Sequence, residues 1–381
     1  MNFDWIEGVD MTMKAAIYDP WEPIHALRRY GQYVLSSVEF TVTHLCNMRC
    51  EHCAVGDALT SKEGEPLPVE MMLRRLDEVE HLETISLTGG EPTFREDTIR
   101  KVMLPLLQYA KERGVRTQVN TNLTLDLDRY EMLAPYVDVM HISYNYTGPE
   151  DFYEMGFARA GHPVAARTAQ KLYDRMLDNA RHLSQGGLFL SAESMINYRT
   201  HERIGDMHRT IAEVGCKRHE VHPMYPSAFA ASLPKLSLEQ VRATIHRLLD
   251  VKEERLWVLF GTLPFFACSE RQEELTLLKR LADTDGVTVR NDPDGRNRLN
   301  VDMFNGNVHV TDFADLSALG NIRQDRLEQV FARWLEHPLA RTVSCHCPEA
   351  NCCGPNLLVK SMYYDDTDFS SRKSKLDLGA G

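Results

Sequence analysis

The chain has 381 residues, with 55 acidic and 43 basic side chains and a formal net charge of -12 when the histidines are neutral. Hydrophobic residues make up 43% and charged residues 26%, which gives enough apolar surface for a globular core. The most apolar run, at 256–268, is shorter than the roughly 18 to 20 residues that a membrane span needs. The negative charge argues against a broad nucleic-acid surface. We therefore expect neither a membrane protein nor a nucleic-acid partner.

The cysteines favour a reducing environment and a metal-binding role. The first residues, Met1 to Trp5, carry neither the basic nor the apolar stretch of a secretory signal, so we expect a cytoplasmic protein. The cysteine count is odd, at nine, and most of the cysteines stand in two short clusters. This pattern indicates metal or cluster ligation rather than a disulfide framework.

Short β-branched runs alternate with amphipathic helical patterns from residue 38 to about residue 261. About six βα units in succession imply a parallel sheet, and we predict an α/β fold with a partial (β/α)6 barrel of the TIM type. Ligands of such sheets bind at the C-terminal ends of the strands. The strands are predicted at 38–44, 84–88, 116–121, 138–144, 188–195, 219–224 and 256–260, and helices at 69–79, 99–110, 204–214 and 238–248.

The rest of the chain divides into three further parts. Residues 1–37 are predicted to form an irregular extension before the barrel at 38–261. Beyond 262 we expect the βα alternation to stop, with a hairpin at 301–310 and an amphipathic helix at 327–335. Residues 262–364 are therefore predicted to be a C-terminal domain, and residues 365–381 a polar tail.

The first cysteine cluster, Cys46, Cys50 and Cys53, comes directly after the first predicted strand. Three thiolates at this spacing can wrap one face of a cuboidal iron-sulfur cluster and leave the fourth iron without a protein ligand. The alternative is a structural zinc site, with His44 or His52 as the fourth ligand.

The second predicted strand ends in Gly89, Gly90, Glu91 and Pro92. A pair of glycines at a strand terminus lets the backbone approach a ligand, because no side chain stands in the way. The exposed carbonyl groups and the Glu91 carboxylate could accept hydrogen bonds from an ammonium group.

Together, these two motifs resemble those of the radical S-adenosylmethionine (SAM) superfamily, a CxxxCxxC triplet after the first strand and GGEP after the second. The resemblance implies that Cys46, Cys50 and Cys53 hold a 4Fe-4S cluster whose fourth iron is chelated by SAM. It implies reductive cleavage of SAM to a 5'-deoxyadenosyl radical, hydrogen abstraction from a substrate, and a one-electron reductant of the flavodoxin or ferredoxin type. His52 takes a position that is usually aromatic and carbocyclic, where an imidazole can also pack beside adenine.

Polar residues near the ends of the later strands are candidate contacts to the cofactor. A carboxylate such as Glu193 suits a ribose diol, and a guanidinium such as Arg199 suits a carboxylate. Each position has an alternative interpretation as a turn former or a helix cap. The candidates are Asn120, Asn122, Ser143, Glu193, Asn197 and Arg199.

The second cysteine cluster comprises Cys345, Cys347, Cys352 and Cys353. These thiols could hold an auxiliary iron-sulfur cluster or a zinc ion, or could include a reactive thiol. The preceding hairpin and helix resemble the SPASM/Twitch extension of radical SAM enzymes that act on peptides, and the C-x-C-x4-C spacing is similar to that of YfkAB-type proteins.

The SPASM/Twitch resemblance implies one auxiliary 4Fe-4S cluster in the C-terminal domain. Its expected ligands are Cys345, Cys347 and either Cys352 or Cys353. Cys268, in the loop after the last barrel strand, is a further candidate, with a buried apolar cysteine as the alternative.

We expect a radical SAM enzyme that modifies a peptide or protein, in the manner of a maturase. Cys353 and Tyr225 are candidate catalytic residues, although a tyrosine at a barrel mouth is more commonly a packed wall. Only 37 residues precede the barrel, too few for an independent peptide-recognition domain, so a small-molecule substrate is the alternative. A non-catalytic zinc-binding interaction protein is a second alternative, which leaves the Gly-Gly-Glu-Pro motif unexplained.

Overall fold

The computed structural model describes residues 19–311, 316–345, 347 and 350–369. The first half of the predicted extension and the end of the predicted tail lie outside the described residues. Within them, eleven strands form one sheet in the order β11-β10-β9-β1-β2-β3-β4-β5-β6-β7-β8. The strands are β1 (Ser37–Thr41), β2 (Thr84–Thr88), β3 (Arg116–Thr121), β4 (Val139–Ser143), β5 (Leu190–Ile196), β6 (Arg218–Pro223), β7 (Trp257–Gly261), β8 (Val287–Arg290), β9 (Arg298–Asp302), β10 (Asn307–His309) and β11 (Gly320–Asn321).

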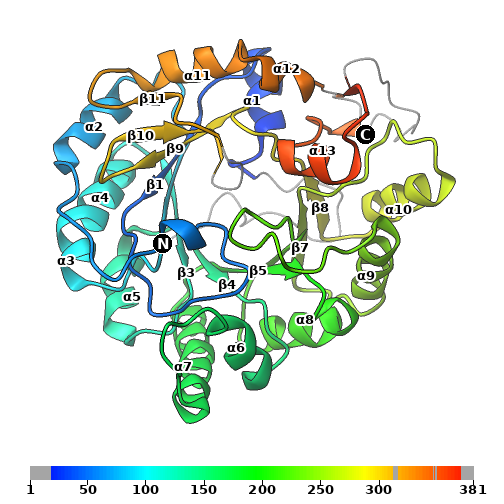
Figure 1. The fold of residues 1–381 in the computed structure, drawn as a ribbon, viewed down its shortest axis with the longest axis horizontal. Coiled ribbons are helices and arrows are strands. Elements are labelled where there is room, and N and C mark those ends of the chain that lie inside the picture. The colour runs from blue at the N-terminus through cyan, green and yellow to red at the C-terminus, as the bar shows by residue number, and fades with distance from the viewer. Residues whose placement is uncertain (1–18, 312–315, 346, 348–349, 370–381) are drawn as a thin grey trace.

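The sheet curls into an open barrel with helices around its outside, as Figure 1 shows. Strands β9 and β1 to β8 pair in parallel, and β10 and β11 add in antiparallel fashion at the β9 edge. The predicted α/β fold with a partial TIM-type barrel is confirmed. None of the described helices is long and apolar enough to cross a membrane.

Helix α1 precedes β1, and the other helices lie between the strands or after the last of them. They are α1 (Pro23–Tyr30), α2 (Val69–Asp77), α3 (Glu96–Thr98), α4 (Leu104–Glu112), α5 (Leu127–Leu133), α6 (Pro149–Gly156), α7 (Ala166–Gln185), α8 (Ile204–Glu213), α9 (Leu238–Asp250), α10 (Gln272–Asp283), α11 (Leu327–Leu335), α12 (Pro338–Thr342) and α13 (Leu357–Tyr363), with short turns η1 (Gly56–Ala58), η2 (Ile99–Met103), η3 (Ala134–Tyr136) and η4 (His201–Arg203).

The βα alternation extends beyond the point at which the sequence predicts that it stops. Helix α10 and strand β8 add another unit, and β9, predicted only as half of a hairpin, pairs in parallel with β1. Strand β8 has no strong apolar signal because all four of its residues are only half buried. The partner of β9 lies far away in the sequence, so no local pattern indicates the pairing.

One predicted helix is interrupted. The helix expected at 99–110 begins with a π-helical turn, η2, and becomes regular only in α4. Pro105 lies in the first turn of α4, where it has no N–H to donate and its ring crowds the carbonyl group four residues earlier. The wider turn is the local adjustment that such a proline favours.

The segment before β1 closes the floor of the barrel, at the N-terminal ends of the strands. The buried ring of Trp21 packs with an apolar cluster of Val139, Phe189, Trp257 and Leu259. Its Nε1 donates to Ser86 Oγ at 3.1 Å. We call the space enclosed by the inward-facing side chains of the strands the lumen. Because the floor is filled, the open end of the lumen is at the C-terminal ends of the strands.

Candidate functional site

The cysteine triplet lies in the loop that follows β1, as predicted. Burial is the main cause that raises the pKa of Cys46 to about 12 and that of Cys50 well above its usual range. The thiol groups are neighbours, because Cys53 raises the pKa of both further and Cys46 raises that of Cys50. Burial also raises the pKa of Cys53. The thiols stay protonated at neutral pH unless a cation binds and stabilises the thiolates.

Two glycines at the end of β2 hold this loop in place. A Cβ atom at Gly89 would lie 2.2 Å from the carbonyl oxygen of Thr43, and one at Gly90 would lie 2.2 Å from that of Leu45. The amide of Gly90 donates to Thr43 O at 2.8 Å, and that of Glu91 donates to Leu45 O at 2.7 Å. The glycines are thus required for the approach of the cysteine loop, in addition to the approach of a ligand that the sequence predicts.

Glu91 is fully buried and connects the ends of β2 and β3. Its carboxylate accepts from the backbone amide of Asn122 at 2.7 Å and from the hydroxyls of Thr121 and Thr93 at 2.8 and 2.5 Å. Burial raises the pKa of Glu91 above its usual value, although these hydrogen bonds act to lower it. The structure therefore places Glu91 as a tie between strand ends, with Pro92, also buried, directly after it.

Two of the predicted polar candidates lie along the cysteine loop. Asn122 Nδ2 is 4.0 Å from Cys46 Sγ and donates to Asn47 Oδ1 at 2.9 Å. Arg199 Nε donates to Glu51 Oε1 at 2.9 Å, and Glu51 belongs to the loop itself. The guanidinium of Arg199 is thereby paired with a loop carboxylate.

Asn197, Asn120 and Ser143 have different surroundings. Asn197 is buried, and its Nδ2 donates to Thr200 Oγ1 at 2.7 Å, so it shapes the turn after β5. Asn120 accepts from Gln118 Nε2 at 2.8 Å in β3. Ser143 is half buried at the end of β4, opposite Glu193 in the strand register. The structure thus brings Ser143 and Glu193 together, with Asn120 on the next strand, and leaves Asn197 and Arg199 outside this group.

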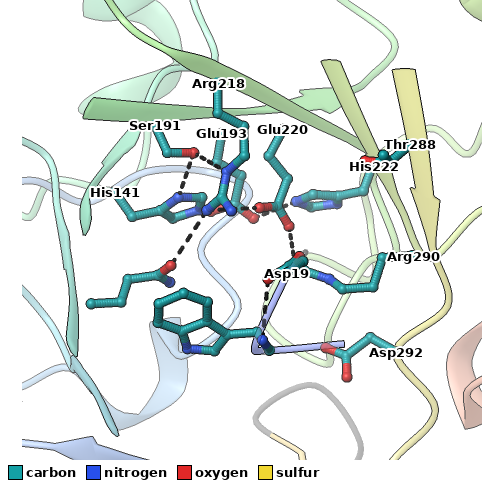
Figure 2. A network of polar contacts seen from close by, with 12 residues as sticks. Asp19, His141, Ser191, Glu193, Arg218, Glu220, His222, Thr288, Arg290 and Asp292 are labelled. Atoms are coloured by element: carbon teal, nitrogen blue, oxygen red, sulfur yellow. Dashed lines mark hydrogen bonds and ion pairs between the residues drawn. The ribbon is translucent and has the colours of Figure 1, made fainter. Parts of the chain in front are cut away.

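Glu193 is the centre of a polar network inside the barrel. Its two oxygens face the Nε2 atoms of His141, at 3.1 Å, and His222, at 2.5 Å. Figure 2 shows these side chains converging from β4, β5 and β6. The Glu193 side chain keeps 32% of its surface exposed, so these two contacts do not fully cover it.

Further residues, on the side of Glu193 that is nearer the floor of the barrel, complete the network. Arg218 Nε donates to Ser191 Oγ at 2.7 Å, and Ser191 Oγ lies 3.1 Å from His141 Nδ1. Arg290 pairs with Asp19 at 2.7 Å and with Glu220 (Figure 2). Of this group, Asp19, Arg218, Glu220 and Arg290 were not singled out from the sequence. The available signal was the polar side chain at every second position of β5, β6 and β8, unusual in strands that a parallel barrel buries.

His222 is an imidazolium in this network. Its Nδ1 lies 3.1 Å from the carbonyl oxygen of Pro223, and its Nε2 faces the Glu193 carboxylate, so both nitrogens have to donate. Burial opposes this charge, but the hydrogen bond to Glu193 and its negative charge raise the pKa of His222. Burial likewise opposes the charge of Glu193, and the two histidines lower its pKa well below the usual range.

A cavity of about 250 Å³ opens at the C-terminal ends of the strands. One wall is the cysteine loop with Gly89 and Gly90, and the opposite wall comes from β9 and β10. Within it, His44 Nε2 lies 3.3 Å from Asp302 Oδ2, which joins the cysteine loop to β9. On that side the cavity is lined by residues of β9, β10 and the chain beyond β10, none of which was predicted to line the site: Asn300, Asp302, His309, Thr311 and Leu316.

Four cysteines meet at a second, smaller cavity. Its lining comprises Cys268, Cys345, Cys347 and Cys352, with the rings of Phe266 and Phe369. Residues 347 and 352 pair as an antiparallel bridge, with the Cys347 amide donating to Cys352 O at 2.7 Å. The Gly354 amide points at Cys352 Sγ, 3.4 Å away. Cys268 thus joins the C-terminal cysteines, and it is half buried against an apolar cluster that includes Phe266, in contrast to the fully buried cysteine of its alternative interpretation.

The two candidate catalytic residues lie apart from the 250 Å³ cavity. Cys353 contacts Tyr33, and burial raises the pKa of this thiol to about 12. The Tyr225 hydroxyl donates to the carbonyl oxygen of Thr262 at 2.9 Å. Neither group belongs to the residues that line the cavity.

Both cysteine sites fit an iron-sulfur cluster by their donor chemistry. Each presents clustered thiols, and at each a backbone amide points at a sulfur atom, Met48 N at Cys46 Sγ and Gly354 N at Cys352 Sγ, both at 3.4 Å. Among the described residues, no group of three or more His, Cys, Asp or Glu side chains could hold a metal ion as it stands. A cubane cluster offers a separate iron to each thiolate, so its ligands need not meet at one point.

Comparison with known proteins assigns these features to families. The model of the radical SAM superfamily matches residues 40–211, and that of the YfkB-like domain matches residues 224–374. The putative protein YfkA of Bacillus subtilis strain 168 is 51% identical over 359 residues, which cover 94% of this chain and 96% of the relative.

Solved structures show the same fold. Streptococcus suis SuiB bound to the precursor peptide SuiA aligns with a TM-score of 0.60 at 15% identity, over 88% of this chain and 75% of SuiB. Native anSMEcpe with bound AdoMet and the Cp18Cys peptide aligns with a TM-score of 0.55 at 14% identity, over 79% of this chain and 80% of that chain.

Replacing Glu193 should change the protonation of His222. The substitution Glu193→Gln removes the negative charge, so the pKa of His222 should fall from above its ordinary value of 6.5 to that value or below. An NMR titration of the histidines in cluster-free protein measures this, with Ser143→Ala as the control that leaves the pair intact. An unchanged pKa in Glu193→Gln would contradict the imidazolium assignment.

The same pair gives a pH dependence of stability. Because the pKa of His222 is raised on folding, protonation of His222 stabilises the folded state. This stabilisation is fully present below pH 6.5 and is lost as the pH rises through the pKa of His222 in the folded protein. Because the pKa of Glu193 is lowered on folding, ionisation of Glu193 also stabilises the folded state. This stabilisation is fully present above pH 4.5 and is lost as the pH falls through the pKa of Glu193 in the folded protein. The destabilisation by Glu193→Gln should therefore be greatest between these two pH values.

Proposed function

Because this chain belongs to the radical SAM superfamily and carries a YfkB-like domain, we propose that it modifies a peptide or protein substrate by hydrogen abstraction. Its class, a radical SAM enzyme that uses a 4Fe-4S cluster and SAM, follows from the family. The observation that carries the proposal is the cysteine triplet at the end of β1, held against Gly89 and Gly90 beside a polar lumen.

Cys46, Cys50 and Cys53 would hold the SAM-binding cluster. When bound, this group supplies the one-electron reduction that cleaves SAM. Glu51 and Arg199 brace the loop from one side, through their 2.9 Å ion pair, and the glycines at the end of β2 brace it from the other. The bracing fixes where the cysteines stand relative to the lumen.

The lumen provides hydrogen-bond partners for the cofactor and the substrate. We propose that Glu193, Ser143 and Asn120 bind the hydroxyl groups of a ribose, because they lie on adjacent strands and part of the Glu193 side chain is exposed. The filled floor around Trp21 keeps water from entering at the opposite end of the barrel.

We propose that the region 262–364 holds an auxiliary 4Fe-4S cluster ligated by Cys268, Cys345, Cys347 and Cys352. These four thiols line one cavity, whereas Cys353 faces Tyr33. Cys353 is thereby assigned outside the ligand set.

A peptide substrate is favoured by two fold relatives that were crystallised with peptides, SuiB with SuiA and anSMEcpe with Cp18Cys. A small molecule is the second candidate, because the cavity of about 250 Å³ has room for one amino-acid-sized group. The cysteines are free thiols, which suits a cytoplasmic location. We propose a one-electron reductant of the flavodoxin or ferredoxin type, as reductive cleavage of SAM requires an electron donor.

Anaerobic reconstitution tests the class and the site together. The wild-type protein should bind about eight irons per chain and, with dithionite, convert SAM to 5'-deoxyadenosine. Replacing Cys46, Cys50 and Cys53 by alanine should leave about four irons and abolish 5'-deoxyadenosine formation. Cleavage of SAM by the triple variant, or stoichiometric zinc in place of iron, would contradict the proposal.

The same assay separates the two substrate classes. A peptide pool should stimulate 5'-deoxyadenosine formation, and the same pool hydrolysed to amino acids should not. Stimulation by the hydrolysed pool alone would favour a small molecule.

The auxiliary ligand set predicts a difference between two cysteines. The substitution Cys268→Ser should lower the iron content from about eight to about four per chain, because it removes a ligand. The matched substitution Cys353→Ser should leave about eight irons in place. Loss of iron in Cys353→Ser with full iron in Cys268→Ser would reverse the assignment.

A further inference from the structure

One loop contacts both cysteine sites. Residues 224–230 follow β6, and Ser227 Oγ donates to the carbonyl oxygen of Cys53 at 3.4 Å. The ring of Phe229 packs against Gly56, where a Cβ atom would lie 2.3 Å from the ring. This end of the loop therefore lies directly on the cysteine triplet loop.

The other end of the same loop lies at the auxiliary cysteines. The ring of Tyr225 packs against the cluster formed by Phe266, Cys352, Val359 and Phe369. Its hydroxyl donates to the carbonyl oxygen of Thr262 at 2.9 Å.

Thr262 has an unusual backbone conformation. It is one of three non-glycine residues in the described ranges with a positive φ, at 50°. This left-handed conformation is unfavourable for a β-branched side chain and persists only where neighbouring groups hold it. The Thr262 amide donates to Arg290 O at 2.8 Å, and its carbonyl group accepts from Tyr225.

The turn at Thr262 sets the course of the loop that carries Cys268. The chain runs from Thr262 through Pro264 and Phe266 to Cys268, at the cavity that the four cysteines line. The Tyr364 hydroxyl donates to Pro264 O at 2.6 Å and fixes the middle of this loop. The direction in which the loop leaves β7 is thus decided at Thr262.

We propose that Tyr225 is a positioning residue: its hydroxyl holds Thr262 in the left-handed conformation and so delivers Cys268 to the auxiliary cysteines. This inference rests on the proposed ligand set, in which Cys268 is a ligand. Since Ser227 binds the Cys53 carbonyl two residues further along, the same loop sets the auxiliary site relative to the SAM-binding site.

The test measures the auxiliary site alone, in full-length protein reconstituted with iron and sulfide. Alanine at Cys46, Cys50 and Cys53 removes the first site, so the remaining absorbance and EPR signal report the auxiliary cluster. Into this background we would introduce Tyr225→Phe, which deletes only the hydroxyl, and follow iron release to a chelator. Iron release should become faster by on the order of fivefold, as the loss of one hydrogen bond predicts, and the EPR line shape should broaden.

Rescue distinguishes positioning from a general loss of stability. Glycine adopts a positive φ without strain, so Thr262→Gly combined with Tyr225→Phe should return iron release and the EPR signal to nearly their original values. The matched control is Tyr363→Phe, since the Tyr363 ring packs on Tyr225 but its hydroxyl donates to Leu236 O, outside this loop. Tyr363→Phe should leave iron release unchanged.

The outcomes separate this inference from the proposed function. Unchanged iron release in Tyr225→Phe, or faster release that Thr262→Gly fails to correct, would overturn the positioning role while the ligand set stands. Absence of any iron in the triple-alanine background would overturn the auxiliary ligand set itself, and with it this inference.

Discussion

The close approach between the end of β2 and the cysteine loop is the contact on which the site depends. A Cβ atom at Gly89 or Gly90 would come within 2.2 Å of a backbone oxygen of the loop, so no larger residue fits unless the loop moves. Burial of the thiols in this loop raises their pKa values. A buried thiol gives up its proton when a cation replaces it, so the same packing that shapes the loop makes metal binding the route to a charged state. Glu91 connects the end of β2 to β3, because its carboxylate accepts hydrogen bonds from Thr121 and Asn122.

The site depends, secondly, on the pairing of the charged side chains inside the barrel. A buried charge is strongly unfavourable unless it is paired, and here Arg290 bridges Asp19 and Glu220, while Glu193 lies between two histidines. Because the partners come from the N-terminal segment and from four strands, the charges are fixed in position before a ligand enters. A lumen of this kind offers oriented hydrogen-bond partners at no further cost of reorganisation.

Local signals in the sequence predicted most of the fold and both cysteine sites. The strands show as β-branched runs, and the cysteine spacings and the GGEP motif are contiguous. The unpredicted features depend on contacts between distant residues: the pairing of β9 with β1, the network around His222, and the wall formed by Asn300 and Asp302. Whether Cys268 lies with the C-terminal cysteines was left open by the sequence, because those cysteines follow much later in the chain. Only the folded chain brings Cys268 and the C-terminal cysteines to one cavity. The packing of the cysteine loop on Gly90 was not predicted, since the loop is not adjacent to this glycine in sequence.

The EPR spectrum of the dithionite-reduced protein, recorded with and without SAM, tests the central claim most directly. If the triplet of Cys46, Cys50 and Cys53 holds a cluster whose open iron binds SAM, addition of SAM should change the spectrum of that cluster, and SAM labelled with 15N at its amino group should add a hyperfine coupling. A spectrum that is identical with and without SAM, in protein that contains its full iron, would contradict it.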